Sequence, residues 1–349
     1  MEFYKAEENR YADMVYRRCG RSGILLPAVS LGLWHNFGSV DVFSNFIQIA
    51  HAAFDHGVTH FDLANNYGPA YGSAEENFGR ILKKGLGAYR DEMIISTKAG
   101  YDMWPGPYGN WGSRKYLMAS LDQSLKRMGL EYVDIFYSHR PDPETPIEET
   151  MEALDGLVKA GKVRAIGASA MYGYQFYNMQ LAAKERGLTP FATMENHYNL
   201  LYREDERELI PICKQMNVAL MPYSPLAAGH LSRPVWNTDS LRSQTDRVAH
   251  GKYDRMEEQD MKVVARVHEL SEKHNCKMSQ IALAWQWAKG VTAPIVGVTK
   301  TAYLDDAAGA LDVKLSAEDV AYLEEMYVPH PVVGAIKRKI PAQGRCAVG

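Results

Sequence analysis

Four side chains of different chemistry stand at or just after the ends of short apolar runs in the first half of the chain. Asp62 lies in FDLA, Tyr67 in ANNYGPAYG, Lys98 in ISTKAG and His139 in FYSHRPDPETP. A carboxylate, a phenol, an ammonium and an imidazole that meet at one site can reduce a carbonyl group when a hydride donor is present. We therefore take these four residues as the candidate catalytic set.

Each of the four has a definite role in such chemistry. An alkoxide formed by hydride addition needs a proton, which Tyr67 can donate. The ordinary pKa of a phenol, about 10, is too high for efficient work near neutrality, so we expect the Lys98 ammonium to lower the pKa of Tyr67. Asp62 would keep Lys98 charged and in place. His139 would donate a hydrogen bond to the substrate oxygen.

Taken singly, these residues also have structural explanations. A loop tyrosine, or a lysine or histidine at the end of a strand, is more often a packing or solvated residue. Asp62 is less ordinary, because a charge inside a strand needs a partner when it is buried. The combination, rather than any one residue, indicates catalysis.

Eight short β-rich runs alternate with amphipathic helical stretches, as in a βα repeat. The runs begin at Val29, His60, Met93, Val133, Val163, Phe191, Val218 and Ala293. Each interval suits one βαβ unit except the seventh, which carries a large insertion. Ser73, with Glu76 after it, and Thr145, with Pro146 after it, are predicted to cap two of the helices.

This order predicts an α/β protein made of a single (β/α)8 TIM barrel, with extra helices at the C-terminal end. An open Rossmann sheet usually has the motif GxGxxG after its first strand, and this chain has HNFGSVD there. A Rossmann domain is therefore disfavoured. The segment VYRRCGRSGILLPA predicts a β-hairpin around Gly20 to Gly23 that plugs the bottom of the barrel. We expect residues 1–13 to be a loose N-terminal extension and residues 14–349 to be the barrel domain. Catalytic groups of such barrels gather at the carboxyl ends of the strands.

The composition limits the classes of molecule that this protein is expected to bind. The formal net charge of −3 gives no field that would attract nucleic acid or anionic lipid. The N-terminus has no apolar stretch of signal-peptide length, and no run of 18 apolar residues follows, so we expect a cytoplasmic protein with no membrane partner. The four cysteines have no metal-ligand spacing, so we expect no metal. A small-molecule carbonyl substrate is the expected partner, and a homo-oligomer is left open.

Several longer strings carry a family resemblance. FDLANNYG, STKAG, YSHRPDPETP, ENHYNLL and YSPLAAGHL resemble, in order and context, the motifs of the aldo-keto reductase superfamily. The resemblance runs from about Val15 to about Tyr327. It is strongest to the bacterial glyceraldehyde 3-phosphate reductases, a group near the potassium-channel β subunits. It implies a catalytic tetrad at Asp62, Tyr67, Lys98 and His139, with NADPH or NADP+ extended across the top of the barrel.

The resemblance also implies which residues hold the cofactor. The nicotinamide carboxamide would contact Ser169 and Glu195, and the ring would stack on Tyr223. Thr299 and Lys300 would bind the 2′-phosphate at a helix N-terminus, which favours NADPH. The other implied cofactor positions are Trp34, Asp62, Ser224, Pro225, Leu226, Gly229, Leu231 and Gly297.

The chain departs from the family pattern at several of these positions. Ala170 stands where the family has Asn, and Tyr303 and Ala307 stand where Gln and Asn contact adenine, so a relaxed or NAD preference stays open. Glu195 replaces a Gln, and a carboxylate accepts hydrogen bonds but donates none. An ionised Glu195 beside the nicotinamide would favour NADP+ over NADPH. Alternatively, Glu195 pairs with a base such as Arg164 and does not touch the ring.

The resulting hypothesis is NADPH-dependent reduction of small aldehydes or ketones, similar to glyceraldehyde 3-phosphate or methylglyoxal, in a pocket walled by Trp34, Tyr67, Trp104 and Trp111. A nearby Arg140 could receive a phosphate or lie on the surface. Two alternatives remain: a polyol or sugar-alcohol dehydrogenase working in the oxidative direction, and a cofactor-sensing subunit similar to the channel β subunits. A metal-dependent hydrolase is disfavoured, because it needs several convergent ligands at strand ends.

Overall fold

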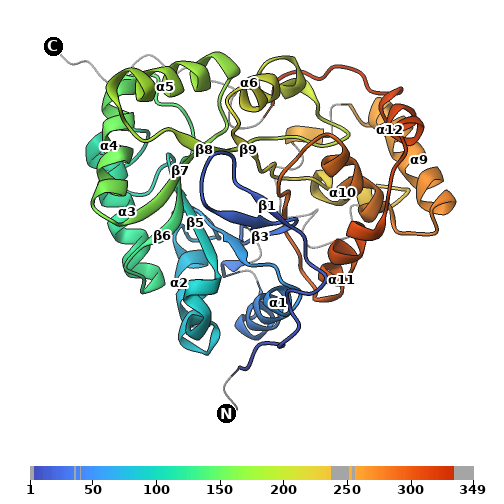
Figure 1. Cartoon of the computed structure of the whole chain (residues 1–349), viewed down its shortest axis with the longest axis horizontal. Helices are drawn as coiled ribbons and strands as arrows, with labels where there is room; N and C mark the ends of the chain where they lie inside the picture. Colours follow the sequence, from blue (N-terminus) through green and yellow to red (C-terminus); the bar gives the residue numbers. More distant parts are fainter. Residues whose placement is uncertain (1–3, 35–36, 40, 237–250, 254–255, 334–349) are drawn as a thin grey trace.

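The computed structural model describes residues 4–34, 37–39, 41–236, 251–253 and 256–333. Eight parallel strands lie in one sheet in the order β10-β3-β4-β5-β6-β7-β8-β9 (Figure 1). They are β3 (Ser30–Gly32), β4 (His60–Asp62), β5 (Ile94–Ala99), β6 (Val133–Ser138), β7 (Val163–Ser169), β8 (Phe191–Glu195), β9 (Ala219–Leu220) and β10 (Ile295–Val296). The Ile295 amide donates to the Pro222 carbonyl at 2.9 Å, which joins the two edge strands. The predicted (β/α)8 barrel is confirmed.

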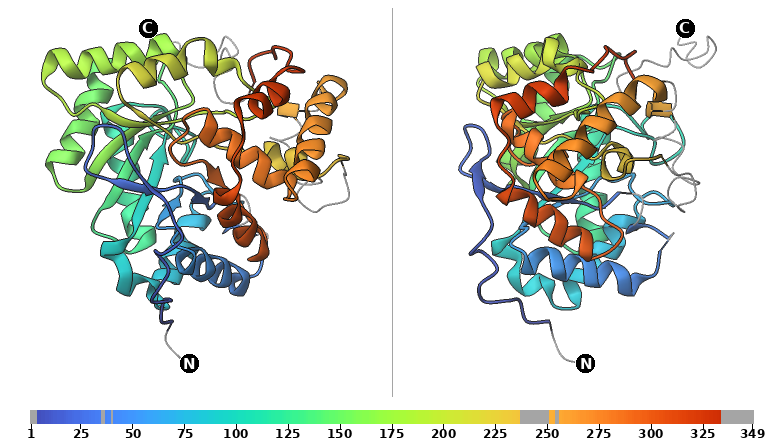
Figure 2. Two further views of the ribbon diagram at one scale, coloured as in Figure 1. Left: turned by 45° about the vertical axis from the view of Figure 1, so that its right-hand side comes forward. Right: turned by 90° about the vertical axis from the view of Figure 1, so that its right-hand side faces the viewer.

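Helices surround the strands on the outside of the barrel (Figures 1 and 2). The α-helices are α1 (Phe43–Asp55), α2 (Ser73–Lys83), α3 (Arg114–Met128), α4 (Ile147–Lys159), α5 (Gly173–Arg186), α6 (Leu209–Gln215), α9 (Glu257–Lys273), α10 (Met278–Ala288), α11 (Ala302–Gly309) and α12 (Ala317–Glu324). The 3-10 helices are η2 (Leu86–Glu92), η3 (Glu204–Arg207), η4 (Ala227–Ser232) and η5 (Ala310–Asp312). The predicted insertion between β9 and β10 holds η4 and α9, and the C-terminal α12 packs against α9.

The two predicted helix caps were wrong. Helix α2 begins at Ser73, and its N-cap residue is Gly72 in a left-handed conformation; the Ser73 hydroxyl instead donates to the Pro69 carbonyl. Helix α4 has Pro146 at its N-cap and no side-chain cap. The first turn of each helix carries two glutamates, whose negative charges interact favourably with the positive end of the helix dipole. They stabilise the helix start although they are not N-cap residues.

The N-terminal hairpin closes the bottom of the barrel, as predicted. Strand β1 (Tyr16–Arg18) pairs antiparallel with β2 (Leu25–Pro27). Cys19 and Leu26 are fully buried in one apolar cluster with the barrel residues Ile135 and Ala219. The turn at Gly20 faces the carbonyls of Ala192 and Asn217, near the starts of β8 and β9.

Residues expected to form a loose extension contact the barrel wall. The Tyr4 ring stacks on His51 at 3.7 Å, and its hydroxyl donates to Asp55 at 2.7 Å. The amide of the buried Ala6 donates to the Tyr89 hydroxyl at 3.0 Å. Residues 1–3 of that predicted extension and residues 334–349 of the predicted domain lie outside the described residues.

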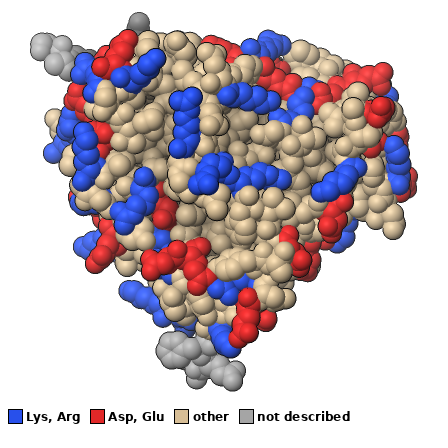
Figure 3. All heavy atoms as spheres, viewed as in Figure 1, with Lys and Arg blue, Asp and Glu red and all other residues tan. Residues whose placement is uncertain are grey.

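Charges of both signs are interspersed on the face drawn in Figure 3. Among the described helices, none is both long and apolar enough to cross a membrane.

The hairpin turn gives a prediction for stability. Gly20 has φ +55°, and a Cβ atom there would lie 2.6 Å from the Asn217 carbonyl oxygen. We expect Gly20→Ala to lower the free energy of unfolding by roughly 1 to 3 kcal/mol for the left-handed backbone alone. Gly23→Ala is the matched control, because a Cβ at Gly23 meets nothing within 4 Å. Denaturant unfolding measures both variants, and equal stabilities would contradict the tight fit of the turn.

Candidate active site

A buried ion pair forms the floor of the site. Lys98, fully buried in β5, places Nζ 2.5 Å from Oδ2 of Asp62, which is 1% exposed in β4. The same ammonium donates to the Leu63 carbonyl at 2.7 Å and to the Tyr67 hydroxyl at 3.2 Å. Three of the four predicted catalytic residues therefore meet at one nitrogen.

A polar chain beneath the ion pair holds Asp62 in position. The Ser96 hydroxyl donates to Asp62 Oδ1 at 2.6 Å, and the buried His60 ring bridges Ser30 and Ser96 at 2.8 and 2.9 Å. Burial lowers the pKa of His60 to about 4, so the ring is neutral near pH 7. The sequence analysis missed this chain. Its signal was the two-residue spacing of His60 with Asp62 and of Ser96 with Lys98, which places each pair on one face of its strand.

Glu195 brings a second carboxyl group to the same ammonium. It ends β8, is 1% exposed, and places Oε2 3.2 Å from Lys98 Nζ. Burial and the neighbouring Asp62 raise the pKa of Glu195. Arg164, the alternative partner considered above, lies over the Tyr132 ring at 3.8 Å instead.

The expected lowering of the pKa of Tyr67 is wrong for this structure. Burial raises it, and the carboxyl groups of Glu195 and Asp62 raise it further. The sequence-based argument counted the charge of Lys98 but not the second acid beside it. The raised pKa keeps the proton on the phenol, which is the form needed to donate it.

His139 lines the cavity beside Tyr67. Its ring makes edge contacts with Tyr67 and Tyr101, with centroid distances of 5.9 and 4.7 Å. Burial, with the nearby charges of Lys98 and Arg140, lowers the pKa of His139 well below its usual range. Its Nδ1 is buried and has no hydrogen-bond partner. A neutral imidazole can still donate one hydrogen bond to a substrate oxygen.

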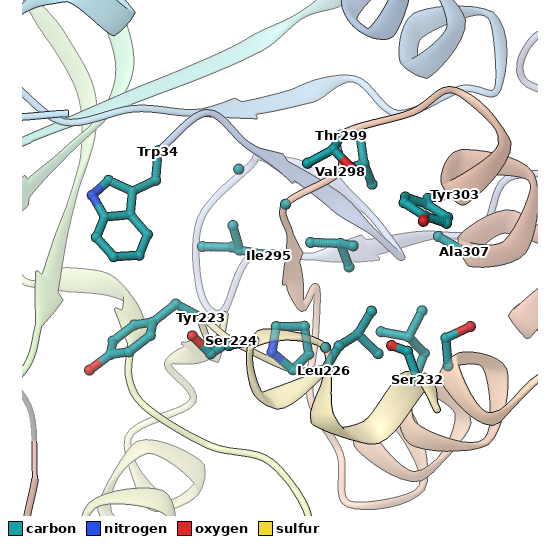
Figure 4. Close-up of a pocket in the computed structure, with 18 of the residues that line it drawn as sticks. Trp34, Tyr223, Ser224, Leu226, Ser232, Ile295, Val298, Thr299, Tyr303 and Ala307 are labelled. Atoms are coloured by element: carbon teal, nitrogen blue, oxygen red, sulfur yellow. The ribbon is translucent and has the colours of Figure 1, made fainter. Parts of the chain in front are cut away.

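These groups open into a cavity of 1230 Å³ that continues along the top of the barrel toward α11 (Figure 4). Trp34 and Tyr223 lie at one end of it, and Tyr303 and Ala307 at the other. The predicted residues that line it are Trp34, Asp62, Tyr67, His139, Ser169, Glu195, Tyr223, Ser224, Pro225, Leu226, Gly229, Gly297 and Thr299. Lys98 lies beneath this lining. Leu231 and Lys300 are not part of it.

The two tryptophans predicted to wall the substrate pocket lie beside this cavity and do not line it. Trp104 packs against Tyr116, with ring centroids 5.3 Å apart. Trp111 is covered by the Arg140 guanidinium at 3.6 Å, and Arg140 also donates to the Gly100 carbonyl. Tyr101, another aromatic candidate for the pocket wall, does line the cavity.

The loop after β9 has an unusual backbone. Ser224, Ala227, Ala228 and Gly229 all have positive φ, between 48° and 101°. Successive backbone amides in such a turn form concave sites that bind anions. Non-glycine residues held in this region are strained and concentrate at functional sites. This part of the cavity wall is therefore suited to a phosphate group.

The cavity wall also carries cations that the sequence did not reveal. Arg233 and Lys277 line it, and Lys277 Nζ lies 2.5 Å from Asp306. Arg233 directly follows η4 and Lys277 directly precedes α10, in a part of the chain where local patterns gave no functional signal.

Asp62, Tyr67, Lys98 and His139 lie at the carboxyl ends of the barrel strands, beside a long cavity. This arrangement defines an oxidoreductase of the carbonyl-reducing type. The family model described as "Aldo/keto reductase family" matches residues 28–328, and the chain belongs to this family. A metal-dependent hydrolase is thereby set aside.

Named relatives agree with this class. The chain is 45% identical to an L-glyceraldehyde 3-phosphate reductase of Escherichia coli strain K12, covering 92% of this chain and 94% of the relative. It is 36% identical to a putative aryl-alcohol dehydrogenase of Schizosaccharomyces pombe, covering 92% and 98%. It is 35% identical to a versiconal hemiacetal acetate reductase of Aspergillus parasiticus, covering 91% and 98%.

Two acids on one ammonium predict non-additive stability. In Asp62→Asn, Glu195 can ionise and serve as the counter-ion of Lys98, and in Glu195→Gln, Asp62 already does so. The double variant leaves the buried ammonium without a carboxylate. We expect its loss of unfolding free energy to exceed the sum of the single losses by roughly 1 to 3 kcal/mol. Urea unfolding of the three variants at pH 7 measures this, and additive losses would contradict the shared contact.

Proposed function

We propose that this protein uses NADPH to reduce small aldehydes and ketones to alcohols, with Tyr67 as the proton donor. The observation that carries the proposal is the Lys98 ammonium, held by Asp62 at 2.5 Å and donating to the Tyr67 hydroxyl at 3.2 Å, beneath a cavity that Tyr67 and His139 line.

The cavity suits a dinucleotide. Ser169 and Glu195 line the cavity where the nicotinamide would lie, and Glu195 Oε2, 3.2 Å from Lys98 Nζ, makes no well-aligned hydrogen bond. The positive-φ loop from Ser224 to Gly229 offers amides for the pyrophosphate. When bound, the cofactor supplies the hydride. Thr299 with Lys300, or Arg233 with Lys277, would hold the 2′-phosphate.

The chain's own residues account for the remaining chemistry. His139, as a neutral imidazole, donates a hydrogen bond to the carbonyl oxygen and orients it. Tyr67 gives its proton to the developing alkoxide. Lys98 stabilises the phenolate that remains, and Asp62 holds Lys98 charged. Trp34, Tyr101 and Tyr223 exclude water from the reacting atoms.

The substrate proposal is a compact carbonyl compound. The aromatic residues that line the cavity suit a substrate with an apolar or aromatic substituent. The similarity to a glyceraldehyde 3-phosphate reductase instead favours a triose phosphate. Arg140 is held by Gly100, Tyr101 and Trp111 and is not part of the cavity lining. Steady-state rates with glyceraldehyde 3-phosphate, methylglyoxal and benzaldehyde, and with the matching alcohols and NADP+, would rank these classes and directions. Tight NADPH binding without turnover of any of them would favour the cofactor-sensing alternative.

Removing one hydroxyl tests the proton donor. We expect Tyr67→Phe to reduce kcat by roughly 100-fold or more, the scale of general acid catalysis, because it removes the hydroxyl proposed to protonate the alkoxide. NADPH affinity should change little, since the ring remains. Fluorescence titration and steady-state rates measure the two effects. Retention of more than a few per cent of kcat would refute this role for Tyr67.

Charge removal at the adenosine end tests the NADPH preference. We expect Lys300→Ala to weaken NADPH more than NADH by roughly 1 to 3 kcal/mol, the value of a charge-assisted hydrogen bond. Lys277→Ala is the comparison, because Lys277 lines the cavity and is paired with Asp306. A selective loss in Lys277→Ala alone would move the 2′-phosphate to α10, and equal losses for both cofactors would count against NADPH specificity.

A further inference from the structure

The surroundings of Lys98 contain one more acid than a neutral site needs. Two carboxyl groups, Asp62 and Glu195, contact one ammonium, and all three side chains are at most 2% exposed. If both carboxyls were ionised, the site would carry a buried net negative charge, which is strongly unfavourable. A single additional proton makes the set neutral.

The contacts identify which acid holds that proton. Asp62 accepts from Lys98 at 2.5 Å and from Ser96 at 2.6 Å, and both bonds favour its ionised form. Glu195 lies farther from Lys98, at 3.2 Å, and its Oε2 accepts no well-aligned hydrogen bond. The proton therefore resides on Glu195.

Every titratable group that influences Glu195 fits this assignment. Lys98 is the cation that favours its ionised form, and Asp62 opposes it. The phenols whose own proton is held more tightly because of Glu195 are those of Tyr67, Tyr101, Tyr137 and Tyr223. None of these phenols compensates a negative charge, so Lys98 is the partner through which Glu195 acts.

We propose that Glu195 is a proton store that recharges Tyr67 through Lys98 during carbonyl reduction. The inference rests on the proposed function. The Tyr67 O–H bond breaks as its proton joins the alkoxide. A proton of the Lys98 ammonium then passes to the phenolate oxygen, and the Glu195 carboxyl proton restores the ammonium. The product is a neutral alcohol, with an ionised Glu195 paired to Lys98. Glu195 lines the cavity and regains its proton from water that enters once the product has left.

The position of Glu195 beside the expected nicotinamide site also predicts how many protons are released on cofactor binding, which can be measured without turnover. A positive nicotinamide beside Glu195 favours the ionised carboxylate, whereas a neutral reduced ring does not. Binding of NADP+ near pH 7 should therefore release a proton from Glu195, and binding of NADPH should release less. Isothermal titration calorimetry in buffers of different ionisation enthalpy measures this number directly.

The test compares wild type with Glu195→Gln, which keeps the shape and removes the titrating group. We expect the variant to lose the difference in proton release between NADP+ and NADPH. Asp205→Asn is the matched control, because Asp205 is another enclosed acid whose partner is Asn196, at 2.8 Å, and not Lys98. It should keep the wild-type difference.

Turnover supplies the second measurement. In wild type we expect kcat for reduction to fall as the pH rises and Glu195 loses its stored proton. In Glu195→Gln this decline should disappear, with kcat at neutral pH lowered by roughly 3- to 10-fold, less than for loss of the direct donor. An unchanged proton difference together with an unchanged pH profile would overturn the role of Glu195. That result would leave the proposed function standing as long as Tyr67→Phe remains inactive, whereas an active Tyr67→Phe would overturn the proposed function itself.

Discussion

A fully buried ammonium at the centre of the barrel top is the constraint on which the site depends. Lys98 cannot be hydrated there, so oxygen atoms of the protein must replace water. They come from Asp62 at the end of β4, from the Leu63 carbonyl and Tyr67 just after it, and from Glu195 at the end of β8. Because these atoms belong to different strands, a small shift of either strand would leave a buried charge unpaired. The ammonium thus fixes the geometry of the groups that act on the substrate.

Side chains beneath the ion pair connect it to the rest of the barrel and hold it in place. His60 and Ser96 tie Asp62 to β3, and Tyr137 fills the interior one layer down. Gly167 accommodates that ring, since a Cβ there would lie 2.4 Å from it. The hairpin closes the bottom, with Cys19 and Leu26 in the same apolar cluster as Tyr137. The catalytic ion pair therefore rests on packed side chains that support its position and take no part in the proposed reaction.

The sequence predicted the strands and their order, because these follow from the period of the apolar residues. Predictions of a helix cap, a pKa shift and a pocket wall failed, because these depend on burial or on residues distant along the chain. Strand spacing was enough to place Asp62 and Lys98 at the carboxyl ends of successive strands of one barrel. The cap at Ser73 failed because the chain enters the helix one residue earlier, through the left-handed Gly72, which leaves Ser73 inside the first turn. The shift at Tyr67 had the wrong sign, because Glu195 lies 128 positions later and its proximity follows only from barrel closure. Trp111 was misplaced for a similar reason, since the Arg140 that covers it belongs to the next βα loop.

The Glu at position 195 changes meaning once its protonation is considered. As a carboxylate it would lack the donor that the amide expected from the family resemblance provides. In its protonated form it is neutral, similar in shape to glutamine, and able both to donate and to accept a hydrogen bond. The raised pKa of Glu195 makes this the form that exists near neutrality. On this proposal the residue can make the contacts of an amide and also carries a proton that can leave. The sequence predicts that Glu195 keeps this contact in altered form, as an acceptor only, and the protonated carboxyl proposed here would make the strength of the contact depend on pH and on the charge of the group beside it.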